Sequence, residues 1–148
     1  MNAEYKEYEK ACVIIRQENE LLLDDFVRML GSQNLAPKTI KKHRDNVDLF
    51  INEFLLYEGT VRPADGIGDV SMYFGDWFIR KAMWSSPSSI KANSVSLYKF
   101  YTFLAASEKV TVEELVELKV TIAVHLPEWQ ARGERYNEGD TDDWRGLD

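Results

Sequence analysis

The stretch at positions 36–55, APKTIKKHRDNVDLFINEFL, decides the fold. Its large apolar residues recur every three or four positions, which places them on one face of a helix. These residues are Ile40, Val47, Phe50, Ile51, Phe54 and Leu55. Pro37 suits the first helical position, because the N–H that proline lacks would have no partner there. Gly59 is expected to end this helix.

A second stretch, SSPSSIKANSVSLYKFYTFL at positions 85–104, also opens at a proline after a polar turn. Ser86 is expected to cap this helix and Pro87 to begin it. Its C-terminal half is apolar on two sides, which is typical of the central helix of a bundle.

Three further helices are predicted from periodicity and caps. They cover residues 19–30, ended by Gly31; residues 69–83, capped by Asp69; and a segment that begins at a capping box of Thr111 and Glu114. The proline and glycines of residues 60–69 predict a loop. The β-branched run KVTIAVHL at 119–126 leaves open a short strand or an extended tail.

Together these elements predict an all-α fold, a four- to five-helix bundle. Residues 1–18 are expected to be a polar N-terminal extension or helix, and residues 19–126 the helical domain. Residues 127–148 are polar, acidic and contain several glycines, which predicts an acidic linker or disordered tail.

The composition is that of a single globular domain: 148 residues, 45% apolar and 29% charged. Cys12 is the only cysteine, so no disulfide can form within the chain. The acidic start, MNAEYKEYEK, lacks the pattern of a secretory signal peptide, and no apolar run is long enough to cross a bilayer. We therefore expect a cytoplasmic protein without a membrane partner.

The net charge of −7 is concentrated at the two ends of the chain. Residues 1–25 hold seven acidic and three basic side chains, and residues 128–148 hold the same numbers, so each end carries −4. The remaining body carries +1. No Asp or Glu occurs from Trp77 to Ser107. The body therefore contains basic stretches that the overall acidity conceals.

No catalytic or metal-binding pattern is visible in the sequence. His43 and His125 are far apart, and neither has a second ligand at a metal-binding spacing. Cys12 is expected to be a buried apolar residue of the first helix. No glycine-rich phosphate loop or nucleophile elbow occurs. We expect no enzyme activity and no cofactor.

Basic and hydroxyl side chains cluster near the starts of the two proline-opened helices. Helix N-termini attract phosphates, and lysine, serine and asparagine can donate hydrogen bonds to phosphates and base edges. The candidate DNA-binding residues are Lys38, Thr39, Lys41 and Lys42 on the first helix and Ser88, Ser89, Lys91, Asn93 and Lys99 on the second. Asp45, one turn after Lys41, weakens the first cluster.

The two stretches resemble the amino-terminal core-binding domain of the tyrosine recombinases, the phage integrase family. The likeness rests on Pro37, Thr39-Ile40 and Phe50 in the first stretch and on the ending KFYTFL at 99–104 in the second, and it covers about residues 20–110. It implies a SAM-like helical bundle that clamps duplex DNA, with these two helices at the major groove. It also implies a recombinase catalytic domain or other recombinase subunits as partners.

The sequence departs from the family pattern in ways that bear on function. Ala36 replaces the usual capping serine, and His43 or Arg44 stands where the family favours an aromatic residue. The family's catalytic domain carries a His-x-x-Arg element, which this chain lacks. By itself the chain is therefore expected neither to cleave nor to join DNA, either as part of a longer integrase or as a separate binding domain.

Two readings of the function remain open. The first is a DNA-binding module of a site-specific recombinase. The second is a stand-alone helical protein-interaction module that uses its acidic ends to meet a basic partner and does not bind DNA. An unrecognised helical enzyme ranks below both.

Overall fold

The computed structural model describes residues 2–81 and 85–145, with side chains described as far as residue 136. Its elements, in order, are helices and short helical turns, and no strand occurs in these ranges. The all-α prediction is therefore confirmed. None of the described helices combines the length and the apolar character needed to cross a bilayer.

Helix α1 (Ala3–Ser32) is one continuous helix, so the predicted extension at 1–18 is its first half. Asn2 caps it by accepting a hydrogen bond from the Tyr5 N–H at 2.8 Å. Cys12 is buried, as predicted. Gly31 lies inside the helix rather than ending it, and the chain reverses at Asn34, whose φ is 61°. Asparagine tolerates this left-handed conformation, and it supplies the stop.

Helix α2 (Pro37–Asp48) begins at Pro37, as predicted, and continues directly into the π-helical turn η1 (Leu49–Phe54). The Leu55 N–H donates to the Phe50 carbonyl at 3.0 Å and closes the turn. The expected end at Gly59 is wrong. Regular hydrogen bonding stops at Leu55, and no glycine has a positive φ in the described part of the chain.

Between η1 and the next long helix the chain makes a series of short elements. The predicted loop holds two 3-10 turns, η2 (Pro63–Asp65) and η3 (Ile67–Asp69). There follow α3 (Val70–Met72), the π-helical turn η4 (Tyr73–Trp77) and α4 (Phe78–Lys81). The Asp69 side chain makes no cap hydrogen bond, contrary to prediction, and the predicted end at Met83 lies outside the described residues.

Helix α5 (Pro87–Ala106) is the central element of the fold. Ser86 caps it as predicted: its hydroxyl accepts from the Ser89 N–H at 3.1 Å, and its own N–H donates to the Ser89 hydroxyl at 2.7 Å. The helix contacts α6, α2 and α1. Its fully buried apolar side chains are Ile90, Leu97, Phe100, Tyr101 and Leu104.

Helix α6 (Val112–Arg145) returns along α5. The predicted capping box is present: the Thr111 N–H donates to Glu114 Oε1 at 2.9 Å, and the Glu114 N–H donates to Thr111 Oγ1 at 3.0 Å. The strand or extended tail expected at 119–126 is wrong. Ile122 and Leu126 of this run lie against the core, and this burial outweighs the weak helix propensity of its β-branched residues.

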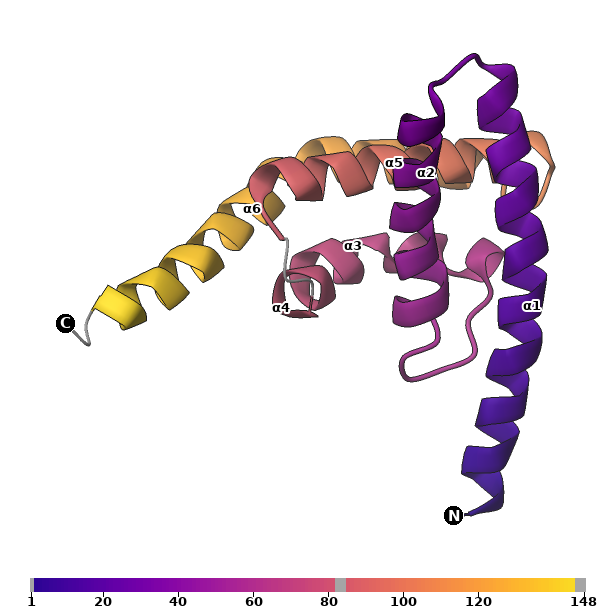
Figure 1. The fold of residues 1–148 in the computed structure, drawn as a ribbon, viewed down its shortest axis with the longest axis horizontal. Coiled ribbons are helices and arrows are strands. Elements are labelled where there is room, and N and C mark those ends of the chain that lie inside the picture. The colour runs from indigo at the N-terminus through magenta and orange to yellow at the C-terminus, as the bar shows by residue number, and fades with distance from the viewer. Residues whose placement is uncertain (1, 82–84, 146–148) are drawn as a thin grey trace.

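The predicted domain boundary at residue 127 falls inside α6. Trp129, only 4% exposed, packs against Phe74 with ring centroids 5.1 Å apart. Gly133 is also buried and faces Ile90. Figure 1 shows α6 bending in its C-terminal part away from the direction of α5, as expected where Pro127 removes a helical hydrogen bond. Residues 127–136 therefore belong to the packed helical body.

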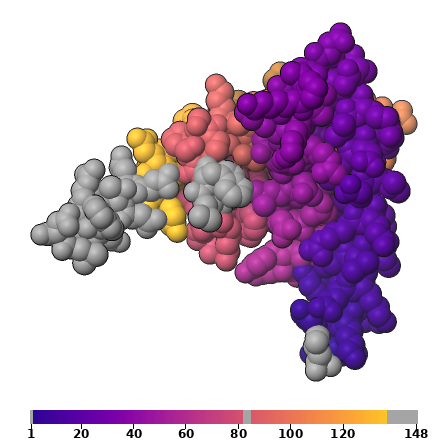
Figure 2. All heavy atoms as spheres, viewed as in Figure 1, coloured from indigo at the N-terminus to yellow at the C-terminus, as the bar shows by residue number. Residues whose placement is uncertain are grey.

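The core contains a cluster of aromatic rings, several of which meet edge to face. Phe50 meets Tyr73 at 4.9 Å, and Phe26 meets Phe100 at 5.4 Å, between ring centroids. The buried Tyr101 hydroxyl donates to the Pro63 carbonyl at 2.8 Å and fixes the η2 turn onto α5. Outside this core, the N-terminal part of α1 extends beyond the body of the molecule (Figure 2).

The burial of Trp129 gives a stability prediction. We expect Trp129→Ala to lower the free energy of unfolding by about 3–5 kcal/mol, because it leaves a large cavity against Phe74. Urea unfolding followed by circular dichroism measures this change. Tyr136→Ala, on the same helix at a side chain 45% exposed, is the control and should change stability by less than about 0.5 kcal/mol. Equal effects of the two substitutions would contradict the placement of Trp129 in the core.

Candidate nucleic-acid interface

Helix α2 crosses α5 at Ser96, a residue with no exposed surface. The Ser96 hydroxyl lies 2.8 Å from His43 Nδ1 and accepts a hydrogen bond from Asn46 Nδ2 at 3.0 Å. It also lies 3.1 Å from the Ala92 carbonyl of its own helix. In Figure 1, α2 passes in front of α5, and its N-terminal end stands clear of it. The two helices predicted to bind DNA are therefore in direct contact.

The contact at Ser96 brings a basic side chain of α5 next to α2. Burial lowers the pKa of His43 below its ordinary value, and the nearby ammonium group of Lys99 lowers it further. His43 is partly buried at the crossing, whereas its neighbour Lys42 is exposed. Lys99 is close enough to His43 for their charges to interact, so α2 and α5 both contribute lysines to the region around this crossing.

A groove runs along the outer side of α5, between α6 and the C-terminal end of α1. Its volume is about 620 Å³. Lys91 and Lys99 of α5 and Lys119 of α6 line it, and none of the described residues that line it carries a carboxylate. Its floor is apolar and includes Tyr98 and Phe103. We call this feature the lysine groove.

Of the three predicted α2 lysines, one forms an ion pair and the other two do not within the described residues. Lys38 and Lys42 are exposed, as is Thr39, and neither lysine has an ion-pair partner in residues 2–81 and 85–136. Lys41 Nζ lies 2.6 Å from Asp45 Oδ2. An exposed ion pair of this kind contributes little stability, but it offsets the charge that Lys41 would offer to a phosphate.

The predicted polar residues at the start of α5 have structural roles. Ser89 completes the capping box, and Ser88 Oγ lies 3.2 Å from Ser86 Oγ. Asn93 is 3% exposed, and its amide donates to the Ser89 carbonyl at 2.8 Å. Asn93 therefore does not reach the surface. Neither Asn93 nor Ser89 is a candidate for the interface: Asn93 is buried, with its Oδ1 left without a hydrogen-bond partner among the described residues, and the Ser89 hydroxyl accepts from the Ser86 N–H.

Sequence reasoning missed Lys119 as a member of the lysine groove. This lysine opens the run at 119–126 that was read as a strand or tail, so no helical face could be assigned to it. The helical start at Thr111 and Glu114 was the available signal. Extending that helix by two turns places Lys119 beside Ile122.

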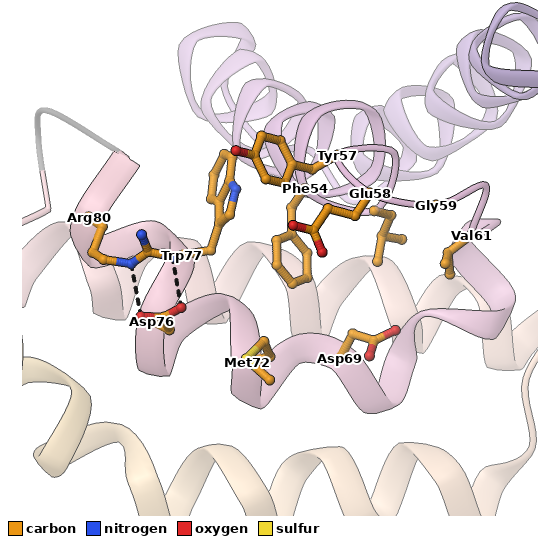
Figure 3. A pocket seen from close by; sticks show the side chains of 11 residues that line it. Phe54, Tyr57, Glu58, Gly59, Val61, Asp69, Met72, Asp76, Trp77 and Arg80 are labelled. Carbon is orange, nitrogen blue, oxygen red and sulfur yellow. Dashed lines mark hydrogen bonds and ion pairs between the residues drawn. The ribbon is translucent and has the colours of Figure 1, made fainter. Parts of the chain in front are cut away.

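A second hollow, between the end of η1 and the segment α3–α4, differs in charge from the lysine groove (Figure 3). Its volume is about 310 Å³, and its lining includes the carboxylates of Glu58, Asp69 and Asp76. The one guanidinium there, that of Arg80, is bound by Asp76, with Nε–Oδ1 and Nη2–Oδ2 distances of 2.9 Å. This acidic hollow is not suited to a polyanion.

No group of three or more His, Cys, Asp or Glu side chains within the described ranges is placed to hold a metal ion. No family model matches the chain, and no curated protein or solved structure matches it.

The lowered pKa of His43 predicts a pH dependence of stability. The unfolded chain takes up the imidazole proton near pH 6.5, whereas the folded chain does so only at lower pH. The unfolded state therefore binds more protons in this window, and the free energy of unfolding falls as the pH decreases below about 6.5. Urea unfolding at several pH values between about 5 and 7.5 measures this effect.

The matched variant is His43→Gln, which keeps a polar group at the crossing and does not titrate. We expect it to flatten the dependence on pH that the parent shows. A profile for His43→Gln identical to that of the parent would contradict the role of His43.

Proposed function

We propose that this chain is a duplex-DNA-binding module of the kind found in site-specific recombinases, and that α2 and α5 contact the DNA. The observation that carries the proposal is the lysine groove together with the crossing at Ser96. Three lysines line one groove without a carboxylate, and Lys38 and Lys42 extend from the helix that crosses α5 beside it.

Electrostatics support this assignment despite the net charge of −7. DNA binding depends on the local density of cations that can neutralise phosphates, because each contact releases counterions from the duplex. The unpaired lysines of α2, α5 and α6 provide such a density. Many of the acidic residues, in contrast, lie at the chain ends or are already bound to arginines, as Glu20 is to Arg44 and Glu18 is to Arg62.

The resemblance to the core-binding domain of tyrosine recombinases supports the same proposal. That domain is a SAM-like helical bundle whose second and fourth helices meet the major groove, and the matching helices here are α2 and α5. We propose the same use of these helices in this chain, with a recombinase catalytic domain or further recombinase subunits as partners. We assign the chain itself no catalytic step.

The apolar floor of the lysine groove favours a second candidate, a helical protein-interaction module. Tyr98 and Phe103 offer apolar contacts that a phosphate backbone does not use. An acidic protein helix would satisfy both the floor and the lysines. Direct measurement of DNA binding separates the two candidates, since only the first requires affinity for a duplex.

The test is fluorescence anisotropy with a labelled duplex at several salt concentrations between about 50 and 200 mM. If four or five lysines neutralise phosphates, the logarithm of the binding constant should fall with the logarithm of the salt concentration with a slope of roughly −4. The double variant Lys42→Glu/Lys99→Glu should reduce the slope by about two and abolish measurable binding at the higher salt.

The control for this variant is Lys6→Glu/Lys10→Glu, which changes the net charge equally on the N-terminal half of α1. We expect it to bind nearly as well as the parent. Lys41→Glu should weaken binding less than Lys42→Glu, because Asp45 already offsets the charge of Lys41. Absence of binding at low salt, or equal losses in the two double variants, would overturn the proposal.

A further inference from the structure

The outer face of α6 carries four exposed valines at a constant spacing of four residues. Val112, Val116, Val120 and Val124 are 65%, 55%, 55% and 63% exposed. We call this surface the valine face. It lies opposite the side of α6 that packs on the core, and it has no contact that explains its apolar character.

The fold alone gives no reason for valine at these positions. An exposed helical valine loses side-chain freedom against the preceding turn, so valine is a weaker helix former than glutamine, lysine or alanine. Its apolar surface is also left in water at each of the four positions. Glu113 is exposed on the same side of α6, at the N-terminal end of the face, and the rest of the face is apolar, which favours a contact surface.

We propose that the valine face binds the same face of a second copy of this chain, with the two α6 helices parallel. The charged residues beside the face favour a second copy of this chain as the binding partner, and they favour a parallel orientation of the two α6 helices. Glu117 and Lys119 are exposed, and neither has an ion-pair partner among the described side chains. Two residues apart on a helix they are separated by about 200°, so they lie on opposite flanks of the valine face.

The direction follows from the symmetry of a dimer. In a parallel pair related by a two-fold axis along the helices, each flank meets the opposite flank of the partner. Glu117 of one copy then lies near Lys119 of the other, twice in the dimer. An antiparallel pair would place each flank against its own equivalent, so that Glu117 faces glutamate and Lys119 faces lysine. The charges therefore favour the parallel arrangement.

The size of the contact predicts a weak dimer. From Val112 to Val124 the face is roughly 18 Å long at 1.5 Å per residue. Residues spaced by four form a ridge inclined to the helix axis, and two such ridges pack with crossed helices that separate beyond a few turns. Such a contact buries less than the ~1,200 Å² typical of stable complexes. We therefore expect dissociation in the micromolar range.

Sedimentation equilibrium of the full chain without DNA, from micromolar to several hundred micromolar, tests this proposal independently of DNA binding. The parent should shift from monomer to dimer with concentration. Val116→Gln/Val120→Gln should weaken the dimer at least tenfold while retaining helicity, because glutamine is the better helix former. Val13→Gln, at an exposed valine of α1 (53%), is the matched control and should leave dimerisation unchanged.

Two further variants test the partner and the direction. Glu117→Lys or Lys119→Glu alone should weaken the dimer, and the combined exchange should restore it, which only self-association with opposed flanks predicts. Val116→Cys, close to the middle of the face where the crossed helices approach, should form an intermolecular disulfide under mild oxidation, because residues near the crossing meet their own copies in a parallel pair. The native Cys12 is buried and does not compete.

A parent that stays monomeric at every concentration would refute the proposal. So would a dimer insensitive to the valine substitutions, or failure of the combined charge exchange to restore association. A Val116→Cys chain that crosslinks only when mixed with Val120→Cys would show an antiparallel dimer and overturn the proposed direction.

Discussion

The hydroxyl of Ser96 is the contact on which the arrangement of the two basic helices depends. It is fully buried and joins α5 to both His43 and Asn46 of α2. A serine leaves little bulk between the helices, so their backbones approach closely, and a larger side chain there would displace α2 in a close-packed interior. The mutual position of the α2 and α5 lysines follows from this one small polar residue.

Arginine and lysine have separate roles in this molecule. Arginines on α1, α2, the η2 turn and α4 are engaged internally, with Arg44 bound to Glu20 and Arg80 to Asp76. A planar guanidinium suits such fixed, directional pairs, whereas an ammonium group on a flexible stem adapts to a ligand whose position varies. Most lysines near the crossing remain without a carboxylate partner. Several arginine side chains are thus paired with carboxylates of the same chain, whereas most of the lysines near the crossing are not.

Much of the fold could be predicted from local signals. Pro37, the Ser86 cap and the Thr111–Glu114 capping box each act within one turn, and each is present in the structure. Prediction from the sequence failed where contacts between residues far apart in the chain determine the local structure. The run at 119–126 and the segment after it are helical because they pack on α5 and Phe74. The capping box at Thr111 and Glu114 marks where this helix begins but not how far it extends. Asn93 was wrongly predicted to contact DNA because its side chain is polar. On the helical wheel of α5 it lies between the buried residues Leu97 and Phe100, which indicates a buried position.

The contact between Trp129 and Phe74 has a consequence for how this chain can vary. The first turn of α6 is fixed by its cap at Thr111, and Trp129 is held against the η4 turn at the other end. Adding or deleting one residue between these points would rotate the indole by about 100° and move it by about 1.5 Å along the axis. The number of residues in this interval is therefore constrained, although the identity of the outward-facing ones is not.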